Sequence, residues 1–178
     1  SKITLTLGDE FQFLTKPQEG IFELLDQLER ELGLPFRMGI GYGELLTEIN
    51  PDISIGADGE AFWNARDAIT HVHDKNWSGK SRVRVKGFGE KHDHLLNALL
   101  ATTDTLKSQW TDLQRETFHQ MLKRRIYRES FDQKPFAQEL GISESNLSKR
   151  LSAGNIKLYL HARLAIESSM EALYAETK

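Results

Sequence analysis

Apolar and polar positions alternate near the start of this chain and then change to a helical period. Ile3–Leu7 and Phe11–Leu14 are two short strand-like runs around a polar tip, which predicts a hairpin. Apolar residues three and four apart between Pro17 and Gly33 predict a helix. The chain is therefore expected to begin with a hairpin followed by a helix.

Residues 36–45, FRMGIGYGEL, predict a strand whose glycines at 39, 41 and 43 share one face. That bare face suits either close packing under a helix or the approach of a ligand. A helix that ends near Ile69 and an alternating strand over 82–86 follow. This order of elements predicts an α+β domain over residues 1–89, with an antiparallel sheet and helices packed on one face.

The segment KPFAQELGISESNLSKRL, residues 134–151, has the spacing of a helix-turn-helix. Small Ala137 suits the crossing of two short helices, Gly141 suits a left-handed turn, and Ser143 can cap the second helix. Residues 90–178 are therefore predicted to form an all-α helix-turn-helix domain that binds DNA. The alternative is a small helical bundle whose exposed polar face is merely solvated, since helix-turn-helix folds also serve as protein contacts.

Charge supports the DNA interpretation. Residues 1–100 hold 11 basic and 16 acidic side chains, whereas residues 101–178 hold 12 basic and 10 acidic ones. Lysine and arginine hold phosphates, and asparagine and arginine can pair with base edges. The side chains predicted to contact double-stranded DNA are Lys123, Arg124, Arg125, Arg128, Lys134, Ser143, Ser145, Asn146, Ser148, Lys149 and Arg150. Because one such motif reads few base pairs, a homodimer is expected.

Composition removes several function classes. The sequence has no cysteine, no apolar run near the ~20 residues that span a bilayer, and no signal peptide pattern. A cytoplasmic protein without membrane association is therefore expected. The sequence also lacks a phosphate-binding P-loop and a nucleophilic serine elbow, which argues against those enzyme classes.

A second candidate site is acidic. Asp9 and Glu10 stand at the hairpin tip, where they either keep the turn solvated or bind a hard cation. Further polar residues follow the glycine-rich strand, and Arg66 is a candidate partner for them. The predicted pocket residues are Asp9, Glu10, Glu44, Glu48, Asn50, Asp58 and Arg66.

These segments resemble known families. LGDEF at 7–11, the FRMGIGYGEL strand, ADGEAFWNAR at 57–66 and SRVRV at 81–85 resemble the second half of a diguanylate-cyclase-type domain. With the helix-turn-helix included, the sequence is more closely similar to the bacterial SatD family. GDEFQ at 8–12 and TEINPDISIGADGEAFWNAR at 47–66 are characteristic of that family.

The cyclase resemblance implies a truncated ferredoxin-like, nucleotide-cyclase-like fold that lacks its first strand and helix. It also implies a site where Asp9 and Glu10 would meet Mg²⁺ or Mn²⁺ and a nucleotide. Another metal-binding Asp belongs to the missing strand, so catalysis by these residues alone is not expected.

The leading hypothesis is a DNA-binding transcriptional regulator with a catalytically inactive cyclase-like domain for sensing or dimerisation. The alternative is a metal-dependent nucleotide-binding protein or nucleotidyl-cyclase-type enzyme whose helical tail contacts proteins. A third hypothesis combines the two, with a nucleotide effector that changes DNA affinity.

Overall fold

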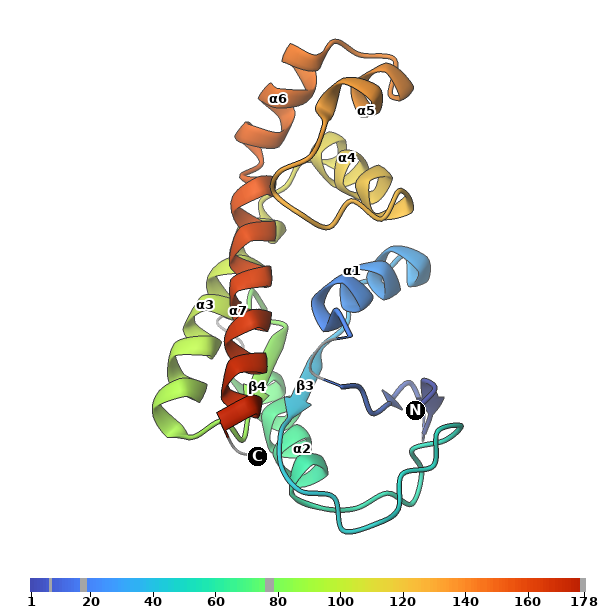
Figure 1. Ribbon diagram of the computed structural model, residues 1–178, viewed down its shortest axis with the longest axis vertical. Coiled ribbons are helices and arrows are strands. Elements are labelled where there is room, and N and C mark those ends of the chain that lie inside the picture. The colour runs from blue at the N-terminus through green and yellow to red at the C-terminus, as the bar shows by residue number, and fades with distance from the viewer. Residues whose placement is uncertain (7, 17–18, 76–78, 177–178) are drawn as a thin grey trace.

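The computed structural model describes residues 1–6, 8–16, 19–75 and 79–176, and within them it is an α+β structure (Figure 1). The predicted α+β class is confirmed. Leu7 and Pro17, which entered the predicted hairpin and helix, lie outside the described residues. The elements are β1 Thr4–Leu5, β2 Phe11–Gln12, α1 Ile21–Leu32, β3 Met38–Gly41, α2 Glu60–Asp74, β4 Val83–Lys86, α3 Glu90–Ser108, α4 Asp112–Lys123, α5 Gln133–Glu139, α6 Glu144–Ala153 and α7 Ile156–Glu176.

The strands form two separate pairs. β1 and β2 are antiparallel, with Leu5 opposite Phe11, so the predicted hairpin is confirmed. β3 and β4 are parallel, with Met38 opposite Val83, so the predicted antiparallel sheet is wrong at this point. The segment between β3 and β4 contains α2, and a helical crossover of this kind returns the chain in the same direction.

Two glycines of β3 explain how α2 packs on the sheet. A Cβ added at Gly39 would lie 2.3 Å from the carbonyl oxygen of Ala65, and one added at Gly41 would lie 1.9 Å from that of Ala61. The bare face of β3 therefore serves close packing under a helix, which was one of the two predicted uses.

The other face of the β3–β4 pair is also covered. Val83 and Val85 alternate with the residues that face α2, and both are buried in a core that includes Leu96 and Leu100 of α3. The prediction of helices on one face only is therefore wrong. Parallel strands are normally covered on both faces, because a helical crossover places a helix on one face and leaves the other apolar.

The hydrophobic core is continuous through both halves of the chain. It contains Phe22 of α1, Val85 of β4 and Leu160 of α7. Figure 1 shows α7 as a long helix that starts beside α6 and ends near α2 and the C-terminus. Helices α4, α5 and α6 lie at the opposite end of the molecule from α2. The last helix therefore connects the two ends.

Candidate functional site

Helices α5 and α6 form as the sequence predicts and are joined by a tight turn. Ala137 is buried, and Gly141 has a left-handed φ of 66° that suits a residue without a Cβ. Ser143 caps α6, because its Oγ accepts a hydrogen bond from Asn146 N at 3.2 Å. The local backbone of this segment is thus specified by its own residues.

Helix α6 has one buried and one exposed face. Leu147 and Leu151 are buried, as predicted, and they fix which side of the helix meets the core. The polar side chains on the other side are exposed: Glu144, Ser145, Asn146, Ser148 and Lys149. Arg150 is half-buried rather than fully exposed. The exposed face therefore carries hydrogen-bonding groups together with the negative charge of Glu144 and the positive charge of Lys149.

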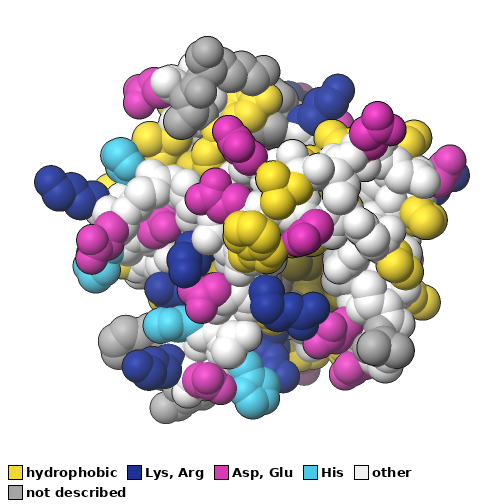
Figure 2. Space-filling view, turned by 90° about the horizontal axis from the view of Figure 1, so that it is seen from below, with side chains coloured by type: hydrophobic (Ala, Val, Ile, Leu, Met, Phe, Trp, Pro, Cys, Tyr) yellow, Lys and Arg dark blue, Asp and Glu magenta, His cyan; other side chains and the backbone are white. Residues whose placement is uncertain are grey.

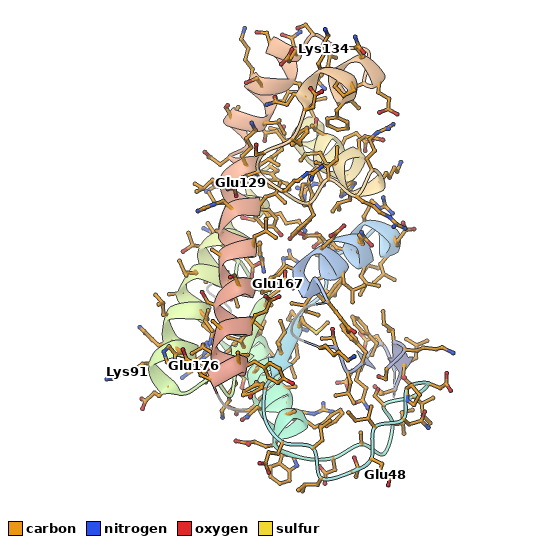
Figure 3. The ribbon with its side chains drawn as sticks, in the orientation of Figure 1. Glu48, Lys91, Glu129, Lys134, Glu167 and Glu176 are labelled. Atoms are coloured by element: carbon orange, nitrogen blue, oxygen red, sulfur yellow. The ribbon has the colours of Figure 1, made fainter. Side chains whose placement is uncertain are left out.

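The basic residues before α5 gather at the same end of the molecule. Lys123, Arg125 and Arg128 are exposed, and so is Lys134 at the start of α5, labelled near the top of Figure 3. Arg124 forms an ion pair with Glu139 of α5. Arg124, at the C-cap of α4, therefore ties this helix to α5, although it is itself exposed like the other basic side chains.

The C-terminal end of α6 is held by a buried tryptophan. Trp110 Nε1 donates a hydrogen bond to the carbonyl oxygen of Gly154 at 2.6 Å. Asn155 follows with a left-handed φ of 50°, which separates α6 from α7. A Cβ at Gly154 would lie 3.1 Å from the side chain of Gln114 on α4, so this junction packs closely. These contacts set the orientation of α6 on the rest of the protein.

The acidic residues of the second predicted site lie at the opposite end. Glu10 is 3.5 Å from Arg66, and both are exposed. Arg66, the predicted partner of the acidic residues, therefore forms its ion pair with Glu10. Asp58 Oδ1 instead accepts hydrogen bonds from Gly59 N at 2.8 Å and Trp63 Nε1 at 2.9 Å.

Asn50 and Glu48 lie in the loop before α2. Asn50 Oδ1 accepts a hydrogen bond from Asp52 N at 2.9 Å, so this side chain stabilises its own turn. Glu48 is exposed and labelled at the bottom of Figure 3. Asp9 is also exposed. Of the predicted pocket residues, Glu44 lines a cavity beside the start of α2.

This cavity has a volume of about 430 Å³ and is lined by Glu44, Leu46, Glu60, Trp63 and Asn64. Trp63 is 57% exposed, so it is not a core residue. Asn64 Nδ2 donates to the carbonyl oxygen of Tyr42 at 2.8 Å. Figure 2 views this end and shows hydrophobic side chains among charged ones of both signs. Sequence reasoning missed Glu60 and Asn64, although the i, i+4 spacing of Glu60 and Asn64 is visible in the helical pattern.

No group of three or more His, Asp or Glu side chains in the described residues is arranged to hold a metal ion. Binding of Mg²⁺ or Mn²⁺ by Asp9 and Glu10 therefore stays a prediction. No described helix combines the length and apolar character needed to cross a membrane.

A buried polar network joins the two halves of the molecule around Asp26 of α1. Its carboxylate accepts hydrogen bonds from Tyr127 Oη at 2.8 Å, Tyr159 Oη at 2.8 Å and Lys107 Nζ at 2.5 Å. Burial and the Asp26 carboxylate raise the pKa of Tyr127 well above its ordinary value. Burial alone would lower the pKa of Lys107, but Asp26 raises it above its usual range. Both groups therefore keep their protons.

Helix α7 contributes three buried polar contacts from positions four residues apart, and one of them belongs to the Asp26 network. Tyr159 donates to Asp26, Arg163 pairs with Asp104 of α3, and Glu167 Oε1 accepts from Ile21 N at 2.6 Å. Sequence reasoning missed this set. The signal was the polar spacing at 159, 163 and 167 on an otherwise apolar helix face.

Comparison with protein-family models shows to which family this chain belongs. The model of the SatD family matches residues 1–170. The chain belongs to the SatD family. This SatD-family chain has no match among curated proteins or among solved structures. The match therefore shows the family and carries no information on activity.

Proposed function

We propose that this SatD-family protein is a DNA-binding regulator in which α5 and α6 act as a helix-turn-helix. The observation that carries the proposal is the division of α6 into a buried leucine face and an exposed polar face. A recognition helix needs both faces, because one face must pack on the rest of the domain while the other enters the major groove. Asn146 and Ser145 would contact base edges, and Lys149 would contact a phosphate or a guanine.

The charges near α6 support the same role. Lys123, Arg125, Arg128 and Lys134 are exposed at the end of the molecule that carries α6. Phosphate contacts of this kind position a protein on the duplex without reading its sequence. The half-buried Arg150 would contribute a guanidinium at the edge of the same surface.

The experiment is fluorescence anisotropy of the protein on a mixed-sequence DNA duplex across a salt series. Binding should weaken linearly in the logarithm of salt concentration. Lys149→Ala should weaken binding and reduce the slope by about 0.9 if Lys149 releases one counterion. Lys91→Ala is the matched control, because Lys91 is exposed at the far end of the molecule (Figure 3).

Three outcomes decide the assignment. Loss of affinity in Lys149→Ala but not in Lys91→Ala supports the α6 surface as the DNA site. Equal effects of the two variants would reduce the interaction to unspecific charge attraction. No binding at low salt would sink the proposal and favour α5 and α6 as a protein-contact module.

We further propose that the protein binds DNA as a homodimer, because symmetric half-sites compensate for the small footprint of one motif. The first 89 residues would then serve for sensing or dimerisation. Sedimentation equilibrium with an operator-length duplex checks this. A single protein chain per duplex at saturation would contradict it.

A further inference from the structure

The cavity beside the start of α2 has the size of a small-molecule site. It lies between the loop that follows β3 and the first turns of α2, and its volume is about 430 Å³. Sites for small ligands have volumes of about 300–1,000 Å³. Figure 1 shows α2 and α6 at opposite ends of the molecule, so this cavity is independent of the proposed DNA site.

Trp63 lines the cavity with an indole ring whose position is fixed. Although Trp63 is 57% exposed, its Nε1 donates a hydrogen bond to Asp58 Oδ1 at 2.9 Å. Asp58 Oδ1 also accepts from Gly59 N at 2.8 Å, which holds this carboxylate at the start of α2. The only polar atom of the indole is thus satisfied within the protein, so the face of the ring remains for a ligand.

The polar groups that the cavity offers beside this indole are mainly hydrogen-bond acceptors. Glu44 and Glu60 supply two carboxylates, and within the described residues neither carboxylate has an ion-pair partner. Asn64 Nδ2 donates to the carbonyl oxygen of Tyr42 at 2.8 Å, which leaves Asn64 Oδ1 as a further acceptor. A ligand that matches this lining must therefore donate hydrogen bonds.

The charge of the cavity also selects the ligand. None of the described residues that line it is positively charged. Arg66 of α2 pairs with Glu10, and Lys86 of β4 pairs with Asp67, so these cations are engaged elsewhere. The positive end of the α2 dipole offsets part of the charge of Glu60, which is in the first turn. Two neighbouring carboxylates are stabilised when a cation binds beside them, so the cavity favours a positive ligand.

The apolar part of the lining favours an organic cation over a metal ion. A hard metal ion needs several oxygen ligands around it, and no group of three or more His, Asp or Glu side chains in the described part of the chain is arranged in this way. Leu46 is 68% exposed and, like the indole face, cannot ligate a metal ion. An indole face does attract organic cations. A planar guanidinium suits this lining best, because it stacks on aromatic rings and donates paired N–H groups to carboxylates.

We propose that this cavity binds a guanidinium cation with an alkyl chain, carried by a small molecule or by an arginine side chain of a partner protein. The guanidinium would stack on Trp63 and donate to Glu44 and Glu60. Its alkyl chain would contact Leu46. Figure 2, which views this end of the molecule, shows acidic side chains beside hydrophobic ones near the centre of the face.

NMR titrations of the full chain with butylguanidinium and with butylurea test the proposal. Butylurea has nearly the same shape and no charge. The chain has three tryptophans, and Trp63→Leu assigns the indole N–H signal of Trp63 while it removes the aromatic face. Glu60→Gln removes one carboxylate but keeps the Cβ that packs near Gly43. Glu48→Gln is the matched control, because Glu48 is exposed in the same loop as Glu44 and does not line the cavity (Figure 3).

Butylguanidinium at millimolar concentration should shift the Trp63 indole signal, and butylurea should not. Glu60→Gln should weaken binding about threefold to tenfold, whereas Glu48→Gln should change it by less than about twofold. Trp63→Leu should weaken binding about twofold to fivefold, measured at the backbone amides of the first turn of α2. A capped Gly-Arg-Gly peptide identifies the source. Tighter binding of the peptide than of butylguanidinium supports a partner's arginine, and the reverse order supports a small molecule.

Other results overturn the proposal. Equal shifts with butylguanidinium and butylurea would show that charge is not recognised. The absence of any shift at Trp63, or equal losses in Glu60→Gln and Glu48→Gln, would remove the cation site. Tighter binding of guanosine than of butylguanidinium would replace the cation by the neutral donor edge of a purine. If Glu60→Gln fails to fold, Glu44→Gln takes its place. DNA affinity is not part of this test, so either proposal can fail without the other.

Discussion

Glu167 of α7 caps the first turn of α1, 146 residues earlier in the chain. Its Oε1 accepts a hydrogen bond from Ile21 N at 2.6 Å, and only 7% of Glu167 is exposed. Gly20, at the N-cap position of α1, offers no side-chain hydrogen bond. The carboxylate therefore provides the acceptor that a local Ser or Asp usually supplies, and it lies near the positive end of the helix dipole.

Glu167→Ala should destabilise the protein by about 1–2 kcal/mol, because the first turn of α1 loses its acceptor. Glu167→Gln keeps an oxygen acceptor and should cost less. Urea unfolding of the three proteins measures the difference. Equal losses in both variants would show that the negative charge, and not the hydrogen bond, stabilises α1.

Stability should also depend on the ionisation of Glu167. Burial raises the pKa of Glu167 above its ordinary value of 4.5, although the hydrogen bond from Ile21 N lowers it in part. An acid with a raised pKa binds more protons when folded. The stability that protonated Glu167 contributes is therefore fully present below the pKa of Glu167 in the unfolded chain. It is lost as pH rises through the pKa of Glu167 in the folded protein.

The wild type should accordingly lose stability relative to Glu167→Gln as pH rises from 4.5 through this window. Thermal or urea unfolding at closely spaced pH values gives the two curves. The unfolding free energies of the two proteins should converge or cross at higher pH. A constant difference would mean that Glu167 titrates as it does in the unfolded chain.

Asp26→Asn should destabilise the protein by about 3 kcal/mol, because it removes one of the two carboxylate partners of the buried Lys107 ammonium, leaves only Glu29, and weakens the acceptor for Tyr127 and Tyr159. The matched control is Asp52→Asn, since Asp52 forms an exposed ion pair with Lys2 at 2.7 Å. An exposed pair of this kind contributes about 0–1 kcal/mol. Similar losses in both variants, measured by urea unfolding, would contradict a structural role for the Asp26 network.

Gly41→Ala should destabilise the protein by about 1–3 kcal/mol or more, because its Cβ would collide with the α2 backbone. Gly56→Ala is the comparison. Gly56 has a left-handed φ of 86° but open space around it, so only backbone strain of about 1 kcal/mol is expected. Equal effects on the midpoint of thermal unfolding would show that α2 can move away from β3.

The local chemistry of single segments determined several elements without tertiary information. Gly141 and Ser143 specify the turn and the cap of α6, because each acts on backbone within three residues. Period-four spacing correctly predicted that Leu147 and Leu151 are buried. The α+β class and membership of the SatD family also followed from residue patterns in the sequence.

Long-range packing decided the rest. The direction in which β4 joins β3 depends on how α2 crosses the sheet, and a strand pattern looks the same in a parallel and an antiparallel pair. The partners of Asp26, Arg163 and Glu167 come from distant helices, so no local spacing identifies them. Sequence patterns report which face of an element is buried, whereas only the folded chain determines which element covers it.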